Sequence, residues 1–255
     1  MLSLPLQLAL LFGAGLIAGF INILAGGGSL LTLPILIFLG LPAAVANGTN
    51  RVAILIQNLA AIAAFHQHQV FPWRLSLLAA IPATLGAIIG ANLALNISDA
   101  LFKQILAGVM IAVLFLTIVD PTKYLQAAPP SLTGWRRVLF WLGFFGVGVF
   151  GGFIQAGVGF IIISVMLLTG FNLVATNAVK VLVTFIFTIA AFIVFMAHGQ
   201  VDYLFGASLG LGSALGGLLS TRLAVKKGHQ WIRAFVVVMV IIFSAKLLLD
   251  SFTLK

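Results

Sequence analysis

The sequence predicts an all-α polytopic membrane protein built from two inverted-topology repeats. The composition is too apolar for a water-soluble chain, the hydrophobic segments follow the same order of lengths twice, and polar landmarks in the two halves share one spacing. Each repeat is expected to contain about four full transmembrane helices and one short, broken helix.

The composition excludes several classes of protein. Of the 255 residues, 62% are hydrophobic and only 7% are charged. Soluble domains carry about 25% charged residues, so the surface of this chain could not be kept in water. The chain has no cysteine, which excludes disulfides, thiolate catalysis and cysteine-bound metals. The formal charge is +9, and it lies mostly between apolar segments, where it indicates membrane topology and not nucleic-acid binding.

Hydropathy divides the chain into long and short apolar segments. In the first half these segments are 6–25, 30–39, 43–65, 75–95 and 101–119. In the second half they are 138–154, 160–169, 173–197, 203–223 and 231–249. The order long, short, long, long, long therefore occurs twice. We divide the chain into a first transmembrane repeat (1–120), a cytoplasmic linker (121–135) and a second transmembrane repeat (136–255).

Individual residues repeat along with the hydropathy. Gly40 and Gly170 are separated by the same length of sequence as Asn47 and Asn177. We call this shared separation the repeat offset. Internal duplication on this scale is common in secondary transporters.

Loop charges predict the orientation, because cytoplasmic loops are enriched in Lys and Arg. The basic residues that mark cytoplasmic loops are Arg74, Lys123, Arg136, Arg137, Arg222, Lys226, Lys227 and Arg233. The loop at 198–202 has no Lys or Arg and is expected outside. Equivalent loops then lie on opposite sides of the membrane, which is typical of an inverted repeat, and both termini fall outside.

A glycine cluster precedes each short segment. Gly26, Gly27 and Gly28 come before 30–39, and Gly157 and Gly159 come before 160–169. Ten helical residues span about 15 Å, half of the hydrocarbon thickness, so each helix is expected to break at membrane depth. The amino end of the restarted helix would then point inward, and its free N–H groups would face an anion.

Close helix packing is the alternative role for glycine in this chain. We prefer packing for the isolated small-x-x-x-small pairs, and we keep it as an alternative for the two clusters. The isolated pairs are Gly15/Gly19, Gly86/Gly90 and Gly212/Gly216.

Two long segments begin with an asparagine followed by a basic residue. Asn47, Asn50 and Arg51 lie in the first, and Asn177 and Lys180 lie in the second. Ionisable residues inside membrane segments are functional candidates, so Arg51 and Lys180 are predicted to form a two-sided positive site. Snorkelling to the headgroups is the alternative. Weaker candidates, each of which could instead make one interhelical hydrogen bond, are Asn22, Gln57, Asn58, Asn92 and Gln155.

The acidic residues argue against a cation pathway. The chain has no Glu, and Asp99, Asp120, Asp202 and Asp250 lie at or near predicted segment ends. An anion site made of basic residues, amides and helix ends fits better than a carboxylate relay. No P-loop, His-Glu-x-x-His motif or Ser/His/Asp set is present, so we expect neither an enzyme nor a metal or cofactor.

A series of motifs runs through both halves in a recognisable order. In the first half they are Gly15, Gly19, Asn22, the cluster 25–28, Leu33-Pro34, Gly40-Leu41-Pro42 and the stretch 46–50; in the second they are Gly151-Gly152, 157–159 and 176–178. In order and spacing the chain resembles the sulfite exporter family TauE/SafE of bacterial membrane proteins, over nearly its whole length. The resemblance implies two facing bundles in the bacterial inner membrane and transport of sulfite, an organosulfonate or a small carboxylate-like anion.

We therefore expect a secondary anion exporter that works by alternating access between the repeats. The anion would be held by N–H groups after Gly28 and Gly159 and by the Asn, Arg and Lys side chains above. The expected partners are this anion and the lipid bilayer, without nucleic acid, and a homo-oligomer is possible. Two alternatives stay open: a non-transporting membrane scaffold or accessory subunit, which should have no polar cavity, and a cation- or proton-coupled importer.

Overall fold

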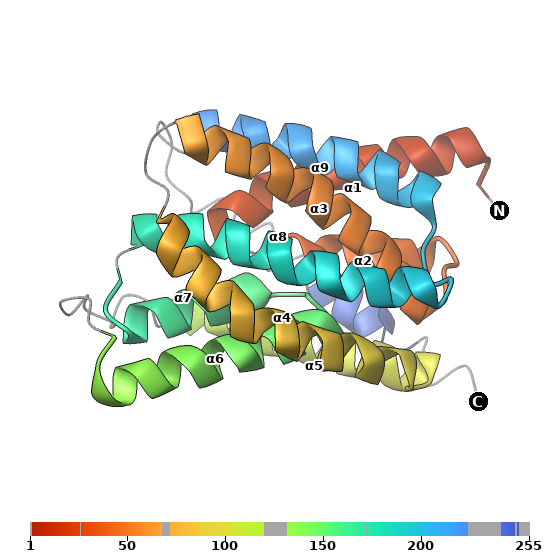
Figure 1. Ribbon diagram of the computed structural model, residues 1–255. Coiled ribbons are helices and arrows are strands. Elements are labelled where there is room, and N and C mark those ends of the chain that lie inside the picture. The colour runs from red at the N-terminus through yellow and green to blue at the C-terminus, as the bar shows by residue number, and fades with distance from the viewer. Residues whose placement is uncertain are drawn as a thin grey trace.

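The computed structural model describes residues 2–25, 27–67, 72–119, 132–171, 173–223, 241–247 and 249. Every regular element in these ranges is a helix, as predicted (Figure 1). The helices are α1 (Leu4–Ala25), α2 (Ser29–Phe38), α3 (Ala43–Gln67), α4 (Trp73–Leu95), α5 (Asp99–Val119), α6 (Gly134–Phe153), α7 (Val158–Leu168), α8 (Leu173–Ala197) and α9 (Tyr203–Leu223), and residues 241–247 are also helical. Most of the predicted linker and residues 231–240 of the last predicted segment lie outside these ranges.

The described helices are those of a multi-pass membrane protein. Six of them, α1, α4, α5, α6, α8 and α9, are long and apolar enough to cross a bilayer. On α4, the large side chains of Ile81, Leu85 and Leu93 are more than half exposed. Such a face suits lipid, because the helix satisfies its own backbone hydrogen bonds and presents only hydrocarbon.

The two short helices fold back along the helices that precede them. A methyl group on Gly143, midway along α6, would lie 2.9 Å from the late α7 residue Val165, and one on Gly151, near the end of α6, would lie 3.2 Å from Val158 at the start of α7. α2 likewise packs on α1, and Figure 1 shows it returning toward the end of the molecule where α1 begins. The amino ends of α2 and α7 therefore lie inside the protein, as the sequence predicted.

Helices are exchanged between the two halves of the chain. α4, from the first half, packs mainly on α6 and α8, and α9, from the second half, packs mainly on α1 and α3. By the repeat offset, α1 corresponds to α6, α3 to α8 and α4 to α9, so the same arrangement occurs twice. α3 and α8 contact each other between these two groups.

Glycine lets the exchanged helices approach very closely. A methyl group on Gly15 of α1 would lie 2.2 Å from the Leu209 carbonyl oxygen of α9, and one on Gly216 of α9 would lie 1.9 Å from that of Leu16. A methyl on Gly90 of α4 would meet a carbonyl of α6 at 2.0 Å. The isolated glycine pairs are therefore packing positions, as predicted.

Among the basic residues predicted to mark cytoplasmic loops, those whose side chains the structure describes lie at one end of the molecule. Figure 1 places the starts of α4, with Arg74, and α6, with Arg136 and Arg137, at the same end. The turn at 198–202 lies at the opposite end, where α1 begins. The structure does not describe the other side chains behind the predicted orientation, and which end faces the cytoplasm stays a prediction.

Candidate functional site

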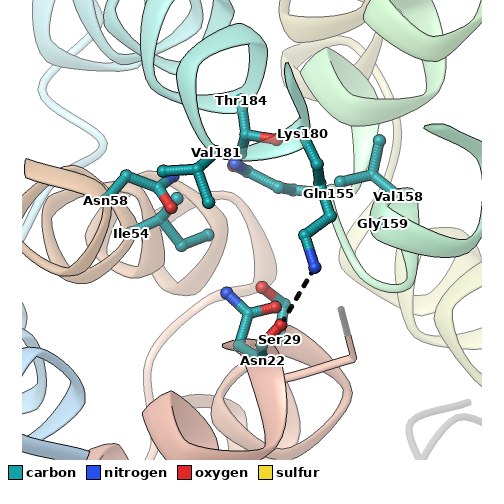
Figure 2. Close-up of a pocket in the computed structure, with 10 residues that line it drawn as sticks. All are labelled: Asn22, Ser29, Ile54, Asn58, Gln155, Val158, Gly159, Lys180, Val181 and Thr184. Carbon is teal, nitrogen blue, oxygen red and sulfur yellow. Dashed lines mark hydrogen bonds between the residues drawn. The ribbon is translucent and has the colours of Figure 1, made fainter. Parts of the chain in front are cut away.

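The two helix breaks meet at a small polar cavity between the halves of the chain (Figure 2). The cavity is lined by Asn22, Ser29, Ile54, Asn58, Gln155, Val158, Gly159, Lys180, Val181 and Thr184. Ser29 is the first residue of α2, and Gly159 lies in the first turn of α7. Both restarted helices therefore direct their positive amino ends toward the same space.

The cavity volume is about 20 Å³. This is room for roughly one or two water molecules, and less than a sulfite or sulfonate ion occupies. The polar side chains therefore surround a space that a ligand of that size would have to enlarge.

Lys180 brings the only positive side chain to the cavity lining. It extends from the second turn of α8, only 6% of it is exposed, and Nζ donates to the backbone oxygen of Asn22 over 3.4 Å (Figure 2). None of the lining residues is acidic, and the ion pair recorded in the described part of the chain joins Lys103 to Asp99, at the start of α5. A buried cation without an acidic partner favours entry of an anion, because burying an unpaired charge is costly.

Asn58 adds an unused donor to the same cavity. Its side chain is 2% exposed, and Nδ2 has no hydrogen-bond partner among the described residues. Leaving a buried donor unsatisfied costs about 1–3 kcal/mol, so such groups call for an explanation. An anion oxygen would satisfy this amide.

Arg51 is fully buried but does not line the cavity. Nη1 donates to the Gly151 carbonyl over 3.2 Å and to Gln155 Oε1 over 2.9 Å. Nη2 donates to the Gly152 carbonyl and, over 3.3 Å, to Asn47 Oδ1. Gly151 and Gly152 belong to the last turn of α6, whose carbonyls lack partners within the helix and form its negative end. Arg51 therefore caps α6.

The chain between α6 and α7 is held by several further contacts. Gln155 adopts a left-handed backbone conformation with φ of 59°, which is rare for a residue other than glycine. Its side chain accepts from Arg51 and donates through Nε2 to Thr188 Oγ1 over 2.7 Å. Asn47 Nδ2 donates to the Phe153 carbonyl over 2.7 Å. These bonds fix one wall of the cavity.

Asn50 holds the start of α2 in place. Its Nδ2 donates to Ser29 Oγ over 3.2 Å, and its Oδ1 accepts from Thr32 Oγ1 over 2.6 Å. The Gly28 N–H donates to Asn22 Oδ1 over 3.3 Å, which joins the end of α1 to the start of α2.

Some of the backbone N–H groups at the two helix starts have partners within the chain. Those of Leu30 and Leu31 donate to the carbonyls of Gly27 and Gly28, and that of Phe160 donates to Gly157. The first turns of α2 and α7 thus use N–H groups that were predicted to hold the anion, because each turn tightens on its own carbonyls. Anion contact with the other N–H groups of these turns stays a prediction, and the side chains add further donors.

The structure brings together only some of the predicted site residues. Asn22, Gln155, Gly159 and Lys180 line the cavity, as does the weaker candidate Asn58. Outside the lining are Gly27, Gly28, Asn47, Asn50, Arg51, Gly157 and Asn177, and Gly26 lies outside the described residues. Their contact with an anion stays a prediction.

Several lining residues were missed by sequence reasoning. Ser29 and Gly159 are separated by the repeat offset, and so are Ile54 and Thr184. The spacing of the repeat could therefore have found Ser29 from the predicted Gly159. Ile54 and Thr184 are equivalent only to each other, and the sequence marked neither of them.

Fold and site together define a multi-pass membrane protein with a buried, cationic and acid-free cavity between two groups of helices. The model of the family "Sulfite exporter TauE/SafE" matches residues 11–247. The chain belongs to this family of membrane transporters.

Similar proteins cover almost the whole chain. A "probable membrane transporter protein" of Haemophilus influenzae is 31% identical over 245 residues, which are 96% of this chain and 95% of the relative. The "probable membrane transporter protein YfcA" of Escherichia coli K12 is 30% identical over 254 residues, 97% of this chain and 91% of the relative. A third, "ORF9" of Sinorhizobium sp, is 30% identical over 249 residues, 95% of this chain and 93% of the relative. No solved structure matched the chain significantly.

Proposed function

We propose that the protein is a secondary transporter that exports a small oxyanion, such as sulfite, an organosulfonate or a small carboxylate, across the bacterial inner membrane. The observation that carries the proposal is the pairing of Lys180, a buried cation without an acidic partner among the described residues, with the unsatisfied Asn58 amide in one cavity. An anion would supply both the missing counter-charge and the missing acceptor.

The cavity offers the remaining donors that an oxyanion needs. Asn22, Ser29, Gln155 and Thr184 surround Lys180 with amides and hydroxyls, each able to bond one oxygen. Charge-assisted hydrogen bonds to an anion are about twice as strong as neutral ones, so a few suffice. Arg51, Asn47 and Asn50 stabilise the walls through their hydrogen bonds to the two helix breaks.

We further propose that transport proceeds by alternating access between two inverted repeats, with both termini outside. The arrangement of helices supports this proposal. α1 and α6 are equivalent by sequence spacing, yet they start at opposite ends of the molecule in Figure 1. The cavity also lies between the halves and is too small for the ion, so binding and release require the halves to move.

The polar cavity favours transport over the scaffold alternative, for which we expected a closed core without one. A cation- or proton-coupled importer is disfavoured because no lining residue is acidic.

Flux into liposomes tests the proposal. Purified protein is reconstituted, and uptake of sulfite, methanesulfonate, sulfoacetate and acetate is measured against empty liposomes. Lys180→Met should abolish uptake, because Met keeps the unbranched shape and removes the charge. Lys103→Met is the matched control, since Lys103 lies at the start of α5 and outside the cavity lining. If no anion enters faster than in empty liposomes, or if Lys180→Met transports normally, the proposal is wrong.

A further inference from the structure

Equivalent backbone carbonyls meet a cation in each half of the protein. Arg51 of α3 donates to Gly152 at the end of α6, and Lys180 of α8 donates to Asn22 near the end of α1. Asn22 and Gly152 are separated by the repeat offset, so they occupy the same place in the two repeats. In each case the cation comes from the opposite half and meets the negative end of a broken helix.

The two cations differ in how firmly they are held. Arg51 donates to four acceptors and lies 4.7 Å from the centre of the Phe195 ring, away from the cavity. These hydrogen bonds all come from one rigid, planar guanidinium group. A movement that breaks one of the four bonds therefore disturbs the other three. The recorded hydrogen bond of Lys180 is a single one, at 3.4 Å, and its side chain borders the cavity.

We propose that Lys180 exchanges the Asn22 carbonyl for the transported anion, and that this exchange releases the end of α1, while Arg51 keeps the end of α6 fixed. The inference rests on the proposed function and adds a division of labour to it. Lys180 would bind the anion and, when no anion is bound, hold the α1–α2 break in place through its hydrogen bond to Asn22. Arg51 would be a positioning residue for the α6–α7 break.

The exchange is favourable on electrostatic grounds. A full negative charge attracts an ammonium group much more strongly than a carbonyl dipole does, above all where water is scarce. The carbonyl left behind can accept from water once the cavity enlarges. Because Asn22 Oδ1 also accepts from the Gly28 N–H, movement at Asn22 would pass directly to the start of α2.

Cysteine labelling tests the exchange, since the chain has no cysteine of its own. Ala18→Cys lies four residues before Asn22 in α1, and Val147→Cys lies four residues before Gly151 in α6. Both positions are buried, at 2% and 0% exposure. The rate of reaction with a methanethiosulfonate reagent is measured in reconstituted protein with methanesulfonate and with neutral dimethyl sulfone, which has a similar shape.

We expect methanesulfonate, and not dimethyl sulfone, to accelerate labelling at Ala18→Cys by about tenfold, within the usual range for coupling between a site and a conformational change. Val147→Cys should not respond. The double variant with Ala18→Cys and Lys180→Met should be labelled fast, at a rate that does not change when methanesulfonate is added. Ile21→Cys, which replaces another buried α1 residue, serves if Ala18→Cys does not fold.

The outcomes separate this inference from the proposed function. If methanesulfonate enters the liposomes but α1 labelling does not change, the exchange is wrong and anion transport stands. Equal acceleration at Val147→Cys would overturn the division of labour between the two cations. If none of the anions tested enters the liposomes, the proposed function fails, whatever the labelling shows.

Discussion

Replacing Arg51 by Met tests whether this buried cation is a structural cap or an anion ligand. Met fills much of the same volume and removes all the donors. It would leave the Gly151 and Gly152 carbonyls, Gln155 Oε1 and Asn47 Oδ1 without their Arg51 bonds. If Arg51 caps α6, its loss should destabilise the protein in the absence of any anion.

The size of the effect follows from these bonds. A buried acceptor that loses its partner costs about 1–3 kcal/mol. Four acceptors at the low end give about 4 kcal/mol, and relief of the buried charge opposes this, so we expect a net loss of about 3 kcal/mol. At about 2–4 °C per kcal/mol for a chain of this size, Tm should fall by about 6–12 °C.

Thermal unfolding of the detergent-solubilised protein measures this loss. Arg51→Lys keeps the charge without the planar fork and should fall between Arg51→Met and the wild type. Lys103→Met is the control, because its partly exposed ion pair is worth at most about 1 kcal/mol. Added methanesulfonate should still raise the Tm of Arg51→Met. A Tm like that of the wild type, combined with loss of this anion response, would refute the cap and make Arg51 a ligand.

Two further predictions concern packing and the unused amide. Gly15→Ala should prevent stable folding, because its methyl would lie 2.2 Å from the Leu209 carbonyl oxygen, whereas Gly13→Ala meets nothing within 4 Å and should be neutral or slightly stabilising in the same unfolding assay. Equal Tm values for these two variants would contradict the packing argument. Asn58→Leu should leave Tm unchanged or higher, yet raise the KM for methanesulfonate flux about 10- to 100-fold, since a hydrogen bond to a charged group is worth about 1.5–3 kcal/mol. An unchanged KM would remove Asn58 from the site.

Much of the fold is predictable because bilayer thickness sets the lengths of the apolar segments and glycine clusters mark where the helices break. The short segments expected at 30–39 and 160–169 are helices at Ser29–Phe38 and Val158–Leu168. The exchange of α4 and α9 between halves was not predictable. Small-x-x-x-small pairs in apolar helices indicate close packing, but they do not indicate which helix is the partner.

The different roles of Arg51 and Lys180 were hidden by a shift of one residue. By the repeat offset, Lys180 corresponds to Asn50, and Arg51 lies one position further along its helix. One residue turns a helix by about 100°, so the two cations point in different directions from equivalent helices. Arg51 reaches the end of α6, and Lys180 reaches the cavity.

The exchange of α4 and α9 also affects how the chain must assemble. During synthesis α1 and α4 enter the bilayer before their glycine-matched partners α9 and α6 exist. Their glycine faces must remain against lipid or the insertion machinery until the second half has been made. Neither half can complete its own packing, so the two could function as separate polypeptides only when produced together. An ancestral duplication that led to this fold would therefore have fused two subunits that were already interlocked.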